Sequence, residues 1–178
     1  MKSDAMTFPP SILALSGQLG DILRQRGLTC VTAESCTGGG IAHAITSISG
    51  SSDYMLGGIV AYSNEVKQQH LGVRAETLSS VGAVSEQCAR EMARGVRERM
   101  GAQIGVSSTG IAGPGGATAR KPVGLVYIAA SSATDELVLE LRLHGDRLTI
   151  MQDAIQEALQ LTLKLVGADA PDSEQQAT

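Results

Sequence analysis

The apolar residues of the chain recur with the period of an α-helix in three long segments. Residues 11–26, the segment between Ser85 and Gly101, and the segment from Asp146 to Val166 each place apolar side chains three or four positions apart. This spacing gives a helix one apolar face that packs on a core. A glycine directly follows the first two segments, as is typical of a helix end. The pattern therefore predicts three long helices.

Five shorter segments have the composition or the alternation of β-strands. They are residues 28–33, 57–63, 104–109, 123–131 and 137–143. In the last segment every second residue is leucine, which is typical of a strand with one face on a core. The last two strands follow each other directly, and we expect them to pair as antiparallel neighbours.

Two short helices are predicted beside glycine-rich turns. Isoleucines at positions 41, 45 and 48 resume helical spacing after the glycines that end at Gly40. Asn64 can cap a second short helix, which carries Lys67 and ends at Gly72. Lys67 would then lie in the first turn of that helix.

Helices interleaved with strands predict a sheet covered on both faces, and the late antiparallel pair makes that sheet mixed. The predicted fold class is therefore α/β: a single three-layer α/β/α domain with a mixed sheet. Its expected bounds are residues 11–166, with a flexible N-terminus at 1–10 and a disordered tail at 167–178. A chain of 178 residues, 43% of them apolar, suffices for one buried core.

The composition argues against several classes of partner. A net charge of −4 provides no basic face for nucleic acid, and aromatic residues, at 2%, provide few stacking platforms. No apolar run approaches the length of a membrane span. Cys30, Cys36 and Cys88 form no CxxC pair and predict reduced thiols in a cytoplasmic protein. We expect no nucleic-acid or membrane partner, and no metal, because no HExxH motif or close His/Asp cluster occurs.

The segment TAESCTGG at residues 32–39 places a small nucleophile, Ser35, between a predicted strand and a predicted helix. Free N–H groups at a helix start stabilise negative charge, so the amides after Ser35 could hold an oxyanion or, equally, a phosphate. The segment alone leaves two alternatives open. Ser35 or Thr37 could merely cap the helix, and Cys36 could be the nucleophile instead.

A serine nucleophile needs a base, and the histidines offer little. His43 follows Ser35 by eight residues, roughly 12 Å of helical rise, and spacing suggests no acid partner for His70 or His144. Lys67 is a different candidate, because the positive end of a helix dipole disfavours its ammonium form. Lowering a lysine pKa from about 10.4 to about 7.5 requires the ammonium to be destabilised by roughly 4 kcal/mol, which the dipole alone cannot provide, so burial must contribute most of it. On spacing alone, a solvated surface lysine is an open alternative.

Two further segments could contact a ligand. The segment TGIAGPGG at residues 109–116 is too rich in glycine and proline for a regular element, so it predicts a shaped loop that a ligand can approach closely. The segment GDR at residues 145–147 could present the Arg147 guanidinium to a phosphate. Neither matches a Walker or dinucleotide fingerprint, and a tight loop and a helix start are the structural alternatives.

Several short motifs occur in one order along most of residues 11–166. They are TAESCTGG (32–39), GSS (50–52), YSNEVK (62–67), LGV (71–73), GAVS (82–85), TGIAGPGG (109–116), KPVG (121–124) and GDR (145–147). With these motifs the chain resembles the C-terminal domain of the CinA competence/damage-inducible proteins, a family that includes stand-alone nicotinamide mononucleotide deamidases. Such a set in one order is far more specific than any single glycine loop.

The resemblance implies a three-layer α/β/α domain that hydrolyses the carboxamide of nicotinamide mononucleotide to nicotinate mononucleotide and ammonia, as part of pyridine nucleotide recycling. It implies a catalytic Ser-Lys pair at Ser35 and Lys67, with Tyr62 beside it, no cofactor, and a homodimer or higher homo-oligomer. Amides around Cys36 to Gly38 would hold the oxyanion. The substrate-binding residues implied are Cys36, Thr37, Gly38, Gly39, Asn64, Thr109, Gly110, Ile111, Ala112, Gly113 and Arg147.

Two residues depart from the family pattern. Met151 stands where many relatives carry a basic residue after GDR, and Leu125 replaces a commonly polar residue after KPVG. We expect a weaker grip on the phosphate from these departures. Two other functions stay open: a nucleotide-binding module without a productive base, and a Ser-Lys amidase or esterase that acts on another small substrate.

Overall fold

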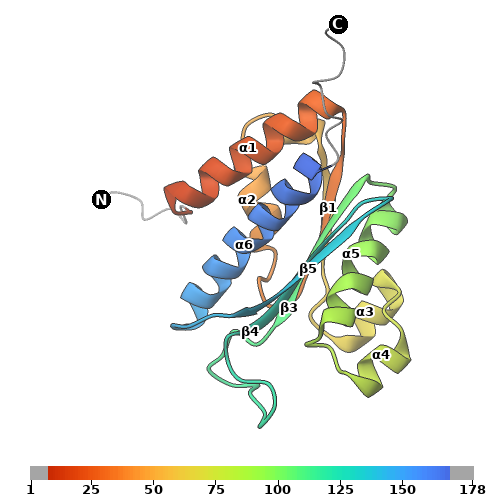
Figure 1. Ribbon diagram of the computed structural model, residues 1–178, viewed down its shortest axis with the longest axis vertical. Helices are drawn as coiled ribbons and strands as arrows, with labels where there is room; N and C mark the ends of the chain where they lie inside the picture. Colours follow the sequence, from red (N-terminus) through yellow and green to blue (C-terminus); the bar gives the residue numbers. More distant parts are fainter. Residues whose placement is uncertain (1–7, 169–178) are drawn as a thin grey trace, which may run out of the picture.

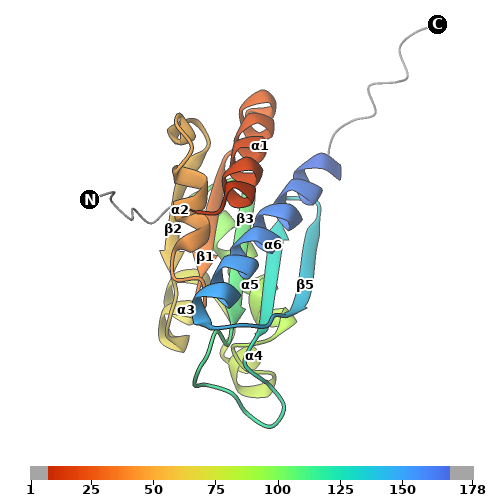
Figure 2. The same ribbon diagram turned by 90° about the vertical axis from the view of Figure 1, so that its left-hand side faces the viewer.

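The computed structural model describes residues 8–168, which form one five-stranded sheet between two layers of helices (Figure 1 and Figure 2). The strands are β1 (Cys30–Glu34), β2 (Met55–Val60), β3 (Ile104–Gly110), β4 (Leu125–Ser131) and β5 (Glu136–Arg142). The helices are α1 (Pro10–Arg26), α2 (Gly40–Thr46), α3 (Asn64–Leu71), α4 (Ala75–Ser80), α5 (Glu86–Met100) and α6 (Arg147–Ala168), with a 3-10 turn at Ser51–Asp53.

The strands lie in the order β2-β1-β3-β4-β5. Strand β1 pairs in parallel with both β2 and β3, whereas β4 runs antiparallel to β3 and to β5. The predictions of a mixed sheet and of an antiparallel late pair are confirmed. Every residue of β1 is buried, as expected of a central parallel strand covered on both faces.

Each face of the sheet carries three helices. In Figure 1, α1, α2 and α6 lie on one side of the sheet and α3, α4 and α5 on the other. The first layer buries apolar side chains such as Leu19, Ile41 and Leu159, and the second buries Met92 and Val96 of α5. The predicted three-layer α/β/α domain is therefore confirmed.

Several element ends differ from the sequence prediction. The hydroxyl of Ser63, not the side chain of Asn64, caps α3 and accepts a hydrogen bond from the Val66 amide at 3.2 Å. Helix α1 begins at Pro10, because proline is well suited to the first helical position. Helix α6 reaches Ala168, two residues past its expected end. The remainder of the expected flexible N-terminus and tail, residues 1–7 and 169–178, lies outside the described residues.

The three parallel strands end at the same edge of the sheet. Register pairs Glu34 of β1 with Val60 of β2 and with Ser108 of β3. The chain segments that follow these strands are the turn at Ser35, the connection to α3 and the glycine-rich loop. In open α/β sheets, ligands bind outside the carboxyl ends of such strands. The fold thus brings three of the predicted site segments to one edge.

A glycine on α5 lets α3 pack closely enough to bring Lys67 over the sheet. A Cβ atom on Gly95 would lie 1.7 Å from the carbonyl oxygen of Leu71, the last residue of α3. No side chain fits there unless the backbone moves, so glycine is required by the close approach of the two helices.

We expect Gly95→Ala to lower the free energy of unfolding by about 1–3 kcal/mol, because the added methyl group must push α3 away from α5. Urea denaturation followed by circular dichroism measures the change. The control is Gly17→Ala in α1, where a Cβ atom meets nothing within 4 Å. That variant should gain about 0.5–1 kcal/mol. A Gly95→Ala protein as stable as the parent would contradict the packing described.

Candidate active site

A cavity of about 280 Å³ opens at the carboxyl ends of β1, β2 and β3. Its walls come from the β1–α2 turn, the β2–α3 connection, the α4–α5 turn, the β3–β4 loop and the start of α6. Most of the predicted site residues line it: Ser35, Cys36, Tyr62, Asn64, Lys67, Thr109, Gly110, Ile111, Ala112, Gly113 and Arg147. Its volume is just below the roughly 300–1,000 Å³ of typical small-molecule sites.

The predicted nucleophile and base are in contact. The Nζ atom of Lys67 lies 3.2 Å from the Oγ atom of Ser35. The same Nζ atom donates to the carbonyl oxygens of Ala61 at 2.7 Å and Tyr62 at 3.5 Å. The two carbonyls belong to the segment directly before α3, the helix that carries Lys67. The geometry is that of a serine hydroxyl beside a possible general base.

Lys67 is buried, not solvated. Lys67 is 2% exposed, and no acidic side chain among the described residues forms an ion pair with its amine. Burial lowers the pKa of Lys67, because removing the ammonium from water disfavours its charged form. The expectation that this lysine must be desolvated is therefore met, and the alternative of a solvated surface lysine is wrong.

The thiol of Cys36 is a poor nucleophile in this environment. Burial raises its pKa to about 12, so the thiol stays protonated near neutral pH. Burial likewise raises the pKa of the Cys88 thiol, which lies near Lys67, to about 11. All three cysteines are free and buried. The electrostatics favour Ser35 over Cys36 as the attacking group.

The histidines lie elsewhere. The ring of His43 on α2 packs edge-on against Phe8 with centroids 4.9 Å apart, and His70 and His144 are exposed. None of them lines the cavity. No histidine is therefore placed to form a Ser-His-Asp triad with Ser35.

Three predicted substrate-binding residues do not line the cavity: Thr37, Gly38 and Gly39. They border a second, more apolar hollow of about 580 Å³ beside Phe8 and Met151. The amide of Gly38 donates to the Ser35 carbonyl, and the amide of Gly39 donates to the carboxylate of Glu34. Gly38 is therefore not free to hold an oxyanion, contrary to the expectation for the amides from Cys36 to Gly38.

The amide of Cys36 bonds no other residue. In the described part of the chain, neither it nor the Thr37 amide donates to a neighbouring residue, and the Cys36 amide contacts only its own thiol. Of these two residues only Cys36 lines the cavity. Its N–H group directly follows the nucleophile, which is a common place for an oxyanion donor.

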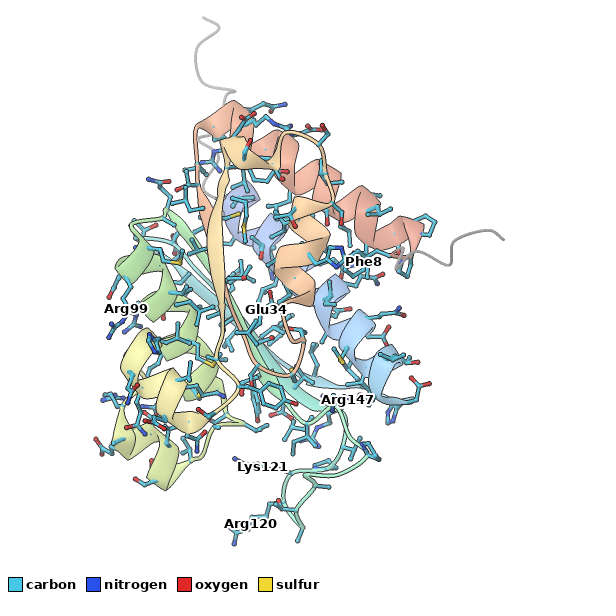
Figure 3. All side chains as sticks on the ribbon, turned by 180° about the vertical axis from the view of Figure 1, so that it is seen from behind. Phe8, Glu34, Arg99, Arg120, Lys121 and Arg147 are labelled. Carbon is cyan, nitrogen blue, oxygen red and sulfur yellow. The ribbon has the colours of Figure 1, made fainter. Side chains whose placement is uncertain are left out.

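Arg147 spans one side of the cavity. Its guanidinium donates to the Gly113 carbonyl at 2.8 Å and to the Tyr62 hydroxyl at 3.1 Å. It thereby joins the first turn of α6 to the β3–β4 loop, as its position in Figure 3 illustrates. A guanidinium carries five N–H donors, so this contact leaves others for an anion. Tyr62 is 64% exposed; its carbonyl oxygen contacts Lys67, whereas its hydroxyl contacts Arg147.

Two hydrogen bonds tie the walls of the cavity together. The Thr109 hydroxyl donates to the Ala83 carbonyl at 2.8 Å, and the Lys121 ammonium donates to the Val81 carbonyl at 2.6 Å. Both join the segment around the β3–β4 loop to the turn before α5. The Thr109 hydroxyl is used in this contact, so it shapes the wall.

Four lining residues were not among the individual site residues predicted: Ala83, Val84, Gly115 and Gly116, of which the two glycines belong to the loop at 109–116 that was predicted to approach a ligand. The first two belong to the GAVS motif, which was the signal available, but small apolar residues carry no chemistry that marks them. Met151 and Leu125 do not line this cavity, so they cannot weaken a ligand contact there directly.

Among the described residues no cluster of three or more potential ligands could hold a metal ion. None of the described helices is both long and apolar enough to cross a bilayer.

Comparisons with known proteins agree with this architecture. The model of the CinA C-terminal domain family matches residues 13–166. A CinA-like protein of Chloroherpeton thalassium is 46% identical over 160 residues, which are 88% of this chain and 38% of the relative. A CinA-like protein of Kosmotoga olearia is 51% identical over 139 residues, or 78% and 34% of the two chains. The chain thus spans just over a third of the length of these relatives.

Solved structures cover nearly the whole fold. The competence/damage inducible protein CihA from Agrobacterium tumefaciens has a TM-score of 0.87 and 42% identity, with 90% of this chain and 98% of that one covered. A competence-damaged protein (CinA) superfamily protein from Escherichia coli has a TM-score of 0.84 and 32% identity, with 93% and 94% covered. The family model spans residues 13–166, and the CihA structure has the same fold at 42% sequence identity; the protein therefore belongs to the CinA C-terminal domain family.

Proposed function

We propose that the protein hydrolyses the carboxamide of nicotinamide mononucleotide to nicotinate mononucleotide and ammonia, with Ser35 as nucleophile and Lys67 as base. The observation that carries the proposal is the 3.2 Å contact between Lys67 Nζ and Ser35 Oγ at a lysine that is 2% exposed. Family membership and the motif resemblance supply the substrate. The role for the protein is the recycling of pyridine nucleotides.

The contacts of Lys67 suit the neutral amine. A neutral amine has two N–H donors and one lone pair, whereas carbonyl oxygens only accept. The carbonyls of Ala61 and Tyr62 can take the two donors, which leaves the lone pair for the Ser35 hydroxyl. In this form Ser35 donates its proton to Lys67 as Oγ attacks the carboxamide carbon.

The remaining steps follow from the same pair. The oxygen of the tetrahedral intermediate carries negative charge, which the Cys36 amide, directly after the nucleophile in the chain, would stabilise. Protonated Lys67 gives its proton to the departing nitrogen, and ammonia leaves an ester on Ser35. Water then loses a proton to Lys67 and attacks that ester, which releases the carboxylate and restores the Ser35 hydroxyl. Arg147 would hold the phosphate at the other side of the cavity, with amides of the Gly110–Gly113 loop.

Replacement of either member of the pair tests the proposal. We expect Ser35→Ala and Lys67→Met to lower the rate of ammonia release from nicotinamide mononucleotide by roughly a thousandfold or more. Ser79→Ala and Lys164→Met, at exposed sites of α4 and α6, are the matched controls and should keep full activity. Chromatography of nicotinate mononucleotide provides a second readout. Tight binding of the nucleotide without turnover would indicate a binding module, and turnover only of other amides or esters would indicate a different substrate.

The acid side of the pH profile should report Lys67. Only the neutral amine accepts the Ser35 proton, so kcat/KM should fall as pH drops through the pKa of Lys67. Burial lowers this pKa, so the loss of activity should begin at a lower pH than the pKa of an ordinary lysine. Full activity should be retained between the ordinary lysine pKa and the lowered pKa of Lys67. A profile that rises only in the range of a solvated lysine would be incompatible with a buried base.

Arg147 should contribute to binding more than to chemistry. We expect Arg147→Ala to raise KM about 10- to 100-fold with a smaller change in kcat, because the anion-binding guanidinium is lost. The matched control is Arg142→Ala at the end of β5, where the arginine pairs with Glu140 and does not line the cavity. Steady-state kinetics at several nucleotide concentrations separates the two constants. A fall in kcat with KM unchanged would remove Arg147 from the proposed phosphate contact.

A further inference from the structure

A buried carboxylate lies directly beneath the turn that carries Ser35. Glu34 is 1% exposed and is the last residue of β1 (Figure 3). Its Oε2 atom accepts hydrogen bonds from the Thr37 hydroxyl at 2.6 Å, the Gly39 amide at 3.0 Å and the Ile41 amide at 2.9 Å. Its Oε1 atom accepts from the Ala42 amide at 2.8 Å. The carboxylate thus replaces the cap that Gly39, at the N-cap position of α2, cannot provide.

The turn is also fixed to β3. The Thr37 hydroxyl has one proton, and because that proton goes to Glu34, the Ser108 hydroxyl 2.6 Å away must donate to Thr37. The Ser35 amide donates to the Ser108 carbonyl at 3.0 Å. Ser108 of β3 therefore holds both ends of the segment from Ser35 to Thr37, the first through its carbonyl and the second through its hydroxyl.

The same glutamate is connected to the base. The Glu34 carbonyl accepts a hydrogen bond from the Ala61 amide at 2.7 Å. The Ala61 carbonyl in turn accepts from Lys67 Nζ at 2.7 Å. The main chain of Glu34 thus aligns the carbonyl that orients the base, while its side chain fixes the turn that holds the nucleophile.

We propose that Glu34 is a positioning residue, whose carboxylate sets the place of the Ser35 hydroxyl relative to Lys67 without contacting the substrate. The inference rests on the Ser-Lys pair of the proposed function but not on the identity of its substrate. A carboxylate suits this position because four donors converge on two oxygens that only accept. A glutamine would turn an NH2 group toward one of those donors and disturb the turn.

The experiment measures the nucleophilicity of Ser35 without any nucleotide. A small fluorophosphonate phosphonylates activated serines with loss of fluoride, and intact-mass spectrometry gives the rate of modification. We expect Glu34→Gln to slow Ser35 modification about 10- to 100-fold, as a displaced reactive group does. Thr37→Val should slow it by a smaller factor, and Thr37→Ser, which keeps the hydroxyl, should restore the parent rate.

The matched control replaces another hydrogen-bonded carboxylate, one that lies outside the cavity lining. Glu91 accepts hydrogen bonds from the Arg74 amide, the Arg74 side chain, the Thr77 hydroxyl and the Gln87 side chain. It does not line the cavity. Glu91→Gln should therefore keep the parent rate of Ser35 modification, even at a similar cost in thermal stability.

Two further readouts separate positioning from general damage. If the variants turn over nicotinamide mononucleotide, kcat should fall in Glu34→Gln while KM and the pH of the acid inflection stay at the parent values. Parent rates of Ser35 modification in both Glu34→Gln and Thr37→Val would overturn the proposal. So would equal loss in Glu91→Gln, or a failure of Thr37→Ser to restore what Thr37→Val lost. If Glu34→Gln does not fold, the comparison of Thr37→Val with Thr37→Ser tests the proposal.

If Ser35 of the parent protein is modified at a normal rate but the parent does not turn over nicotinamide mononucleotide, only the proposed substrate is rejected.

Discussion

The site depends on one unfavourable burial: the amine of Lys67 is enclosed in protein, and no carboxylate among residues 8–168 pairs with it. Desolvation destabilises the ammonium of Lys67 and lowers its pKa, so the amine can be neutral where a surface lysine is charged. Two carbonyl oxygens accept hydrogen bonds from the same Nζ atom, which lies 3.2 Å from the Oγ atom of Ser35. The burial that lowers the pKa of Lys67 also raises the pKa of the neighbouring Cys36 thiol, which leaves the thiol protonated.

The parallel part of the sheet explains how such an amine can be held. Strands β1, β2 and β3 end in register, so the Ser35 turn, the start of α3 and the glycine-rich loop meet above one edge. Helix α3 reaches its place because Gly95 lets the Leu71 carbonyl approach α5. The antiparallel strands β4 and β5 then return the chain so that α6 begins with Arg147 beside the β3–β4 loop.

The amides at the start of α2 bind a carboxylate of the protein itself. In many α/β proteins the free amides at a helix start bind a phosphate. Here the carboxylate of Glu34 takes the amides of Gly39, Ile41 and Ala42, so an intrinsic anion already fills that position. In the proposed mechanism, the phosphate of the substrate would therefore bind the guanidinium of Arg147, and the amide of Cys36 would face the developing oxyanion. The nucleophile would then be positioned by one anion, Glu34, and the ligand held by other groups.

The sequence by itself determined the order and type of the long elements, the three-layer class and most of the cavity wall, because helical periodicity, strand alternation and glycine-rich turns are local properties. It also gave Ser35 as a candidate nucleophile and Lys67 as a candidate base, and the motif resemblance favoured that pair over the alternatives. Helix α4, the cap at Ser63 and the roles of Gly38 and Gly39 depended on competing local partners that the pattern did not rank. Only the tertiary structure decided that Lys67 is buried and touches Ser35, and that Glu34 holds the turn. Solvent exclusion and contacts between residues distant in sequence arise when the layers pack, and no local spacing encodes them.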